Sequence, residues 1–201
     1  MNLQDALEAR IQLARDHDRL VRSQIVYEAI TLESVVDRII ATHFCSDESK
    51  HPAFFSFIFR DGEISFSNKI RILKKILGAS YPSLAKISSA LAKKLDSMRD
   101  LRNKFAHSEL VLPSGDEPSN LDIKLKYYRN GHLEVESLSE ADITRQINDC
   151  RLWHVTLELI AVFVKQVARG EQSQADKAVE ELWTLVQPDS NARRRAKGPG
   201  A

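Results

Sequence analysis

Three side chains near the middle of the chain have the types and spacing needed for acid–base and phosphate chemistry. Arg102, Asn103 and His107 lie within the run Arg102–His107 (RNKFAH). A histidine can accept or donate a proton near neutral pH, whereas an arginine presents a permanently charged fork to phosphate oxygens. An asparagine four residues before a histidine can orient the imidazole ring on a helix. These residue types suit the cleavage of a phosphate ester, which needs proton transfer and a cation on the developing charge.

The helix that must position these residues is amphipathic, and Arg102 lies on its apolar face. At about 100° per residue, the stretch Pro82–Phe105 gathers its apolar side chains into one stripe: Leu84, Ile87, Leu91, Leu95, Met98 and Phe105. A buried guanidinium without a partner costs several kcal/mol. We therefore expect a carboxylate, a helix C-terminus, a subunit interface or a phosphate to receive Arg102. Glu33 and Asp37 are the candidate carboxylates; the alternative is an arginine whose head reaches solvent.

Helix geometry separates His107 from Arg102. In a straight helix His107 lies about 140° around the axis from Arg102 and about 7.5 Å along it. Either the helix ends at Ala106 and the following loop returns the imidazole, or the two residues meet across a two-fold axis. If the last turn persists, Asn103 and His107 can touch.

This motif, at the end of a helix in a mostly helical chain, resembles the R-x4-6-H signature of the HEPN superfamily. The preceding segment Phe66–Leu73 (FSNKIRIL), followed by the long helix into Leu101–Leu110 (LRNKFAHSEL), is similar to the mannitol operon repressor branch and to other small HEPN-like proteins. The similarity covers roughly residues 20 to 110. The toxin branch carries a tyrosine two residues after the histidine, whereas this chain has Glu109 there.

The resemblance implies a helical fold and a ribonuclease. HEPN ribonucleases cleave RNA without a metal, in a composite cleft between two protomers of a homodimer. Carried over residue by residue, Arg102 holds the scissile phosphate, His107 transfers the proton and Asn103 orients the ring. We expect Lys104 and Arg99 to contact the nucleic acid, and we expect no cofactor and no metal ligand.

Two other functions remain open at this stage. One is a non-catalytic helical regulator, because the mannitol-repressor-like relatives are described as transcriptional regulators. The other is an antiphage defence or toxin–antitoxin component whose nuclease is silenced by a protein partner such as an antitoxin.

Composition is that of an ordinary soluble domain. The chain has 201 residues, 43% of them hydrophobic and 28% charged, and a formal net charge of +1. No global field attracts nucleic acid, so any RNA contact must come from a local patch. Cys45 and Cys150 are far apart, which fits reduced thiols in a cytoplasmic protein. Met1–Ala9 does not resemble a signal peptide, and the apolar window Leu152–Ala168 is too short and charged for a membrane span.

Helical periodicity begins almost at the N-terminus. The apolar stripe fails over Arg15–Arg19, where we expect a break or bend, or an N-terminal arm over residues 1–19 that packs on a partner. Five phenylalanines between residues 54 and 66 form a short helix or a hairpin, and we interpret them as a core wall rather than a base-stacking platform. Ser67 is expected to cap the next helix and Gly78 to end it. Pro82 then opens the helix that carries the motif.

One β element interrupts the helices. Apolar and polar residues alternate over Leu121–Tyr128 and continue beyond Asn130-Gly131. Matching apolar faces favours a three-residue loop that pairs Tyr127 with Leu133 over a two-residue Asn-Gly turn. Ser139 and Asp142 then form a capping box.

The predicted fold is all-α, a HEPN-like helical bundle with one inserted β-hairpin at about residues 121–137. We expect residues 1–188 to form a single domain. A short helix over Ala178–Val186 ends before a disordered basic tail at residues 189–201.

Overall fold

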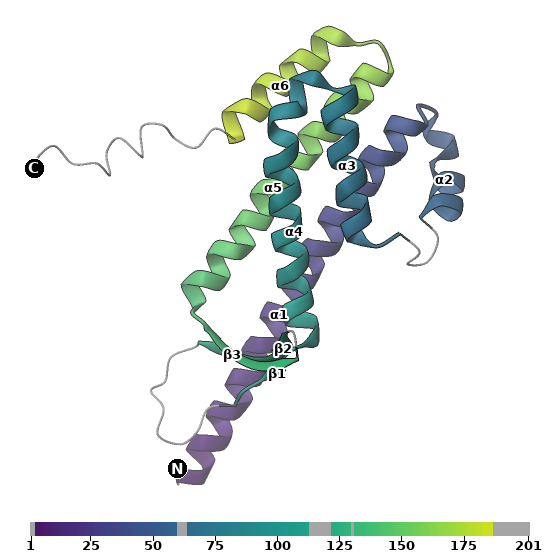
Figure 1. Cartoon of the computed structure of the whole chain (residues 1–201). Helices are drawn as coiled ribbons and strands as arrows, with labels where there is room; N and C mark the ends of the chain where they lie inside the picture. The colour runs from purple at the N-terminus through teal and green to yellow at the C-terminus, as the bar shows by residue number, and fades with distance from the viewer. Residues whose placement is uncertain (1–2, 60–63, 113–121, 130, 187–201) are drawn as a thin grey trace, which may run out of the picture. The chain divides into compact units, whose positions relative to one another are not determined.

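The computed structural model describes residues 3–59, 64–112, 122–129 and 131–186. Most of these residues are helical, and a small antiparallel sheet lies where one long helix ends and the next begins (Figure 1). The helices are α1 (Leu3–Phe44), α2 (His51–Ile58), α3 (Phe66–Ser80), α4 (Ala85–His107), α5 (Glu140–Ala168) and α6 (Gln172–Val186). The strands are β1 (Glu109–Leu110), β2 (Ile123–Arg129) and β3 (His132–Leu138). Short 3-10 turns cover Glu48–Lys50 and Pro82–Leu84.

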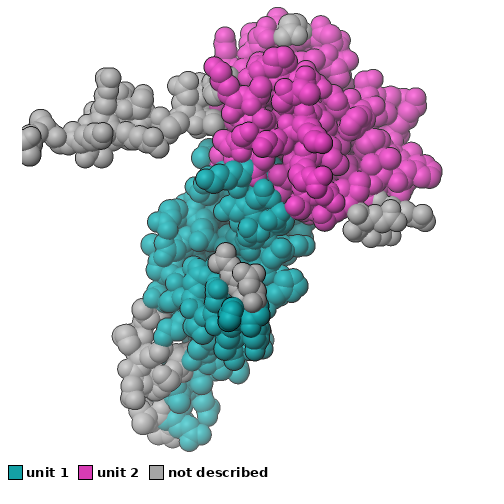
Figure 2. Space-filling model, viewed as in Figure 1, with its two compact units in different colours: residues 1–32, 93–152 teal, residues 33–92, 153–201 magenta. Residues whose placement is uncertain are grey.

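The chain divides into two compact units (Figure 2). Unit 1 comprises Met1–Leu32 and Lys93–Leu152, and unit 2 comprises Glu33–Ala92 and Trp153–Ala201. Parts of α1, α4 and α5 belong to each unit. The motif residues Arg102, Asn103 and His107 all belong to unit 1.

The core of unit 1 consists of buried apolar side chains from α1, α4 and α5 and from strands β2 and β3. Its buried members are Val21, Ile25, Phe105, Ile123, Leu125, Leu138, Ile143 and Ile147. Phe105, which lies within the motif, is fully buried in this core. The last turn of α4 is therefore anchored by apolar packing at the position between Asn103 and His107.

The predicted hairpin is present, but it belongs to a three-stranded sheet and its register differs from the expected one. The strand order is β1-β2-β3, and the short strand β1 pairs with β2. Tyr127 pairs with Glu134 and not with Leu133, and Arg129 pairs with His132, so two residues and not three separate the strands. Gly131 has a φ of +80°, which suits the left-handed conformation of such turns. The preference of an Asn-Gly dipeptide for a two-residue hairpin loop therefore predicts the register better than the matching of apolar faces does.

The expected break at residues 15–19 is absent, because α1 is continuous over Leu3–Phe44. No proline or glycine occurs in this helix. Side-chain pairs four residues apart support it through the region without an apolar stripe. Gln12 Nε2 donates to Asp16 at 3.0 Å, and Arg22 Nε donates to Asp18 at 2.7 Å.

Two predicted boundaries of α3 are also wrong. The N-cap is Ser65 and not Ser67, since Ser65 Oγ accepts from Asn68 N at 3.3 Å. The helix continues past Gly78 to Ser80. It ends at Tyr81, whose backbone (φ −131°, ψ 81°) is not helical, because the ring of Pro82 disfavours the helical conformation in the residue before it. The predicted inward residues of α3 are buried: Ile70, Leu73, Ile76 and Leu77.

The phenylalanine-rich segment is helical in α2, and it is not the expected core wall. None of the five phenylalanines is fully buried, and Phe57 is 80% exposed. Three of the rings pack against one another: Phe54, Phe55 and Phe59 lie with centroids 5.6–6.3 Å apart. The cluster is thus a half-exposed aromatic patch on unit 2.

Glu33 and Asp37 do not receive Arg102. They receive the buried Lys69 of unit 2, whose Nζ lies 2.7 Å from Glu33 Oε1 and 2.8 Å from Asp37 Oδ2. Burial opposes the charge of Lys69, but its hydrogen bonds to Asp37 and Glu33 outweigh that effect and raise the pKa of Lys69. Burial raises the pKa of Asp37 despite the hydrogen bond from Lys69. The carboxylates thus stabilise a different cation from the one predicted.

Towards the C-terminus the structure agrees more closely with the sequence. The capping box is confirmed, because Ser139 Oγ accepts from Asp142 N at 3.1 Å and donates to Asp142 Oδ2 at 2.7 Å. The last helix is longer than predicted and begins at Gln172. The predicted tail at residues 189–201 lies outside the described residues. No helix in the described part of the chain has the length and apolar character of a membrane span.

Candidate functional site

The last turn of α4 persists through His107, and it places Asn103 and His107 on one face of the helix and Arg102 on another. Arg102 is half-buried, and its Nη1 donates to Asn103 Oδ1 at 3.0 Å. His107 is exposed. Within the described residues Asn103 makes no hydrogen bond to the His107 ring, so its amide positions the guanidinium of Arg102 and not the imidazole.

An arginine from α1 caps this turn. Arg22 Nη1 donates to the backbone oxygen of Phe105 and lies 3.4 Å from Ser108 Oγ. Arg22 Nε is paired with the buried Asp18 at 2.7 Å. A cation at a helix C-terminus satisfies carbonyls that have no partner within the helix, and it opposes the negative end of the helix dipole. Arg22 therefore fixes the backbone on which His107 is mounted.

Asn103 and His107 share a cleft with two tyrosines. The cleft has a volume of about 590 Å³ and lies between α4 and the end of β2 in unit 1. Its lining residues are Asp100, Asn103, Lys104, His107, Tyr127 and Tyr128. Arg102 is not among them. A single protomer therefore places the proton-transfer candidate in the cleft and the phosphate-binding candidate outside it.

Glu136 of β3 accepts hydrogen bonds from two residues that line this cleft, Lys104 and Tyr127. Its Oε2 accepts from Lys104 Nζ at 2.6 Å and from Tyr127 Oη at 2.8 Å. Lys104 Nζ also lies 5.4 Å from the centre of the Tyr127 ring. Hydrogen bonding to Glu136, more than burial, raises the pKa of Tyr127 to about 12. At neutral pH Tyr127 is thus a protonated hydrogen-bond donor and cannot act as a base.

The two cations expected to contact nucleic acid both have carboxylate partners. Arg99 is paired with Asp96 at 2.6 Å and with Asp100 at 2.8 Å. Lys104 is paired with Glu136 at 2.6 Å. Arg102, by contrast, makes no ion pair with any residue that the structure describes. Of the basic residues near the motif, Arg102 has the charge that is least neutralised by the protein.

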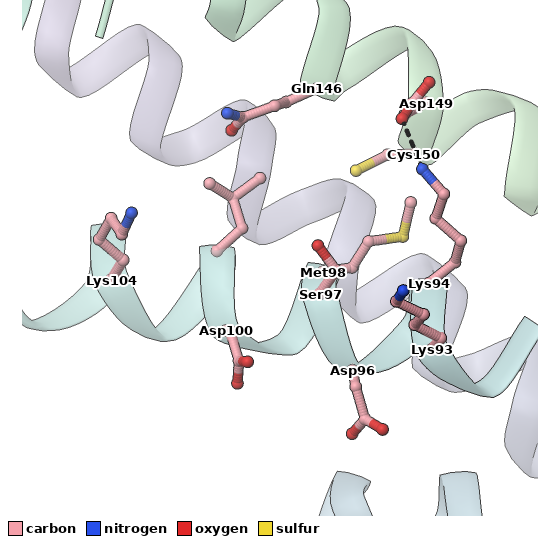
Figure 3. Close-up of a pocket in the computed structure, with 11 residues that line it drawn as sticks. Lys93, Lys94, Asp96, Ser97, Met98, Asp100, Lys104, Gln146, Asp149 and Cys150 are labelled. Carbon is pink, nitrogen blue, oxygen red and sulfur yellow. Dashed lines mark hydrogen bonds and ion pairs between the residues drawn. The ribbon is translucent and has the colours of Figure 1, made fainter. Parts of the chain in front are cut away.

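A second cavity of about 520 Å³ lies between α4 and α5 within unit 1 (Figure 3). Lys94 extends towards α5, where its Nζ pairs with Asp149 at 3.1 Å, while Asp96 and Asp100 point away from α5 (Figure 3). Cys150 contributes a thiol to this cavity. Burial raises the pKa of Cys150 to about 11, so the thiol is protonated at neutral pH and is not a nucleophile. The described residues that line this cavity pack together and form an ion pair, but they include no pair of groups suited to acid–base catalysis.

No protein-family model, curated protein or solved structure matches the chain in three separate comparisons. The resemblance to HEPN proteins therefore rests on the motif and its helical setting. Among the residues that the structure describes, no group of three or more His, Cys, Asp or Glu side chains is arranged to hold a metal ion.

Sequence reasoning missed three residues that shape the site: Arg22, Tyr128 and Glu136. Arg22 lies 83 residues before Phe105, and nothing in its local sequence signals the contact. Tyr128 and Glu136 carried a usable signal, because the Asn-Gly dipeptide favours the two-residue turn that fixes their positions. With that register, Glu136 is placed opposite Leu125 on the inner face of the sheet.

Proposed function

We propose that the protein is a HEPN-like, metal-independent endoribonuclease that acts as a homodimer. Its composite site, at the two-fold axis, would combine the His107 side chains of both protomers with their Arg102 side chains. The proposal includes a defence or toxin–antitoxin setting as the context in which such a nuclease would be held in check by a partner protein.

The observation that carries this proposal is the separation of Arg102 from the cleft of His107. Both residues belong to α4, which is helical through His107, so they lie about 140° apart around the axis. Arg102 has no carboxylate partner in the described part of the chain, and a half-buried guanidinium needs an anion or an interface. A second copy related by a two-fold axis would cover Arg102 at an interface and would bring it to the His107 cleft of the partner.

The chemistry follows from the residue types. The 2′-hydroxyl of RNA attacks the adjacent phosphorus after one histidine takes its proton, and the 5′-oxygen leaves with a proton from a second histidine. A dimer supplies two histidines and two arginines. The Arg102 guanidinium would bind the phosphate oxygens on which charge develops, held in place by Asn103 Oδ1. The products are a 2′,3′-cyclic phosphate and a 5′-hydroxyl, and DNA cannot react because it lacks the nucleophile.

A subunit-mixing experiment tests the composite site. About a tenfold excess of His107→Ala protomers is exchanged with wild type, and cleavage is measured with RNA in saturating excess over total protein. We expect activity per wild-type protomer to fall about tenfold, because nearly every wild-type protomer then has a partner without the histidine. Sedimentation at tens of micromolar should show a dimer for both proteins.

Unchanged activity per wild-type protomer after verified exchange would show that each protomer acts alone. A monomer in sedimentation would contradict the composite site equally. An excess of Tyr27→Ala, which alters an exposed tyrosine of α1 outside the cleft, is the matched control and should not reduce activity.

A further inference from the structure

The register of the hairpin gives the sheet an unusual outer face. Lys124, Lys126 and Tyr128 of β2 lie opposite Ser137, Val135 and Leu133 of β3. We call these six residues the outer sheet face. The alternate residues of both strands, including the buried Ile123, Leu125 and Leu138, face the core of unit 1.

Three large apolar or aromatic side chains are exposed on this outer sheet face. Tyr128 is 76% exposed, Val135 is 61% exposed and Leu133 is 50% exposed. Tyr128 and Leu133 are directly paired across the strands. Leu133 and Val135 thus form an exposed apolar surface beside the ring of Tyr128. The predicted register would have turned Leu133 and Val135, but not Tyr128, towards the core.

The register also sorts charge between the two faces. It places Lys124 and Lys126 on the outer sheet face and directs Glu134 and Glu136 to the opposite one. Lys126 forms no ion pair with any described residue, although Glu109 of β1 is its register partner. The outer sheet face therefore carries two lysines, and Glu109 lies opposite Lys126 on the same face.

Tyr128 connects this surface with the candidate site. Its side chain also lines the cleft that contains Asn103 and His107. The neighbouring Tyr127 cannot play the same part, because its ring is covered by Lys104 and its hydroxyl is held by Glu136. Tyr128 is thus the aromatic ring of the cleft that is available for a ligand to stack on.

We infer that the outer sheet face binds single-stranded RNA and directs it into the cleft of His107. Tyr128 would stack on an unpaired base, Leu133 and Val135 would extend the apolar contact, and Lys126 would bind the phosphate backbone. An exposed aromatic ring beside lysines suits a single strand, because a duplex hides the faces of its bases in the stack. That the strand is RNA and not DNA rests on the proposed function.

The test is binding of a fluorescein-labelled, 2′-O-methyl oligoribonucleotide of about a dozen nucleotides to the full chain, followed by anisotropy. This probe cannot be cleaved by attack of its own hydroxyl, so binding is measured apart from catalysis. Tyr128→Ala should weaken the affinity by about tenfold or more, and Tyr128→Trp should retain it. Lys126→Ala should weaken binding and reduce its dependence on salt.

Tyr27→Ala is the matched control, since Tyr27 is 67% exposed in the same unit but lies outside the cleft and the sheet. The inference is overturned if Tyr128→Ala binds the single strand as wild type does, or if Tyr27→Ala weakens binding equally. It is also overturned if the same probe binds as tightly when annealed to its complement. Loss of a dimer in Leu133→Ser, with Tyr128→Ala binding unchanged, would assign the surface to a second copy.

The binding test of the outer sheet face and the cleavage test of the proposed function can fail independently. Cleavage that depends on His107 together with binding that ignores Tyr128 would overturn only this inference. Binding that depends on Tyr128 without any cleavage by wild type would overturn only the proposed catalysis.

Discussion

Replacing His107 with alanine should reduce RNA cleavage at saturating substrate by at least about 100-fold, the range expected when a general acid–base group is lost. Because His107 is exposed at the last position of α4, its removal should leave the helix and the core intact. Initial rates on labelled RNA, with circular dichroism of both proteins, measure the effect.

His132→Ala is the control for loss of an exposed imidazole. His132 is exposed at the start of β3 and does not line the cleft. Its turnover at saturating RNA should match that of wild type. Equal cleavage by wild type and His107→Ala would remove His107 from the chemistry.

Replacing Lys69 with methionine should lower the free energy of unfolding by about 3 kcal/mol, since removing one partner of a buried ion pair leaves the other charge uncompensated. Glu33 and Asp37 would both lose the ammonium that now lies within 2.8 Å of each. Chemical denaturation at neutral pH measures the loss. The difference from wild type should shrink as the pH falls, because the Asp37 carboxyl, whose pKa burial raises, takes up a proton and no longer leaves an uncompensated charge.

Lys75→Met is the matched control on the same helix. Lys75 is exposed and makes no ion pair with any described residue, so the change should alter stability by less than about 0.5 kcal/mol. If Lys69→Met were as stable as Lys75→Met, the buried cluster would contribute nothing to unit 2.

The sequence predicts well those features that local periodicity determines. The predicted apolar stripe is buried at Leu84, in the 3-10 turn before α4, and at Leu91 and Leu95 of α4. The capping box at Ser139 is also present. Both depend on residues within a few helical turns of one another. The predicted break in α1 failed because a lapse in apolar spacing does not end a helix that contains neither proline nor glycine.

Contacts between distant segments could not be predicted in the same way. Two carboxylates on α1 suit any cation, and only the packing of unit 2 selects Lys69. The capping of α4 by Arg22 likewise depends on two elements meeting in space. At the candidate site, the motif indicated Arg102 and His107, but the tyrosines of the cleft depended on a strand register that face matching had assigned incorrectly.

The most direct measurement for the proposed chemistry is the nature of the new RNA ends. Purified wild type is incubated with RNA and excess EDTA, and the products are resolved by mass spectrometry. Attack by the 2′-hydroxyl predicts 2′,3′-cyclic phosphate and 5′-hydroxyl ends, absent with His107→Ala and absent with DNA of the same sequence. Linear 5′-phosphate ends, or intact RNA under these conditions, would contradict it and leave a non-catalytic regulator of nucleic-acid or protein partners.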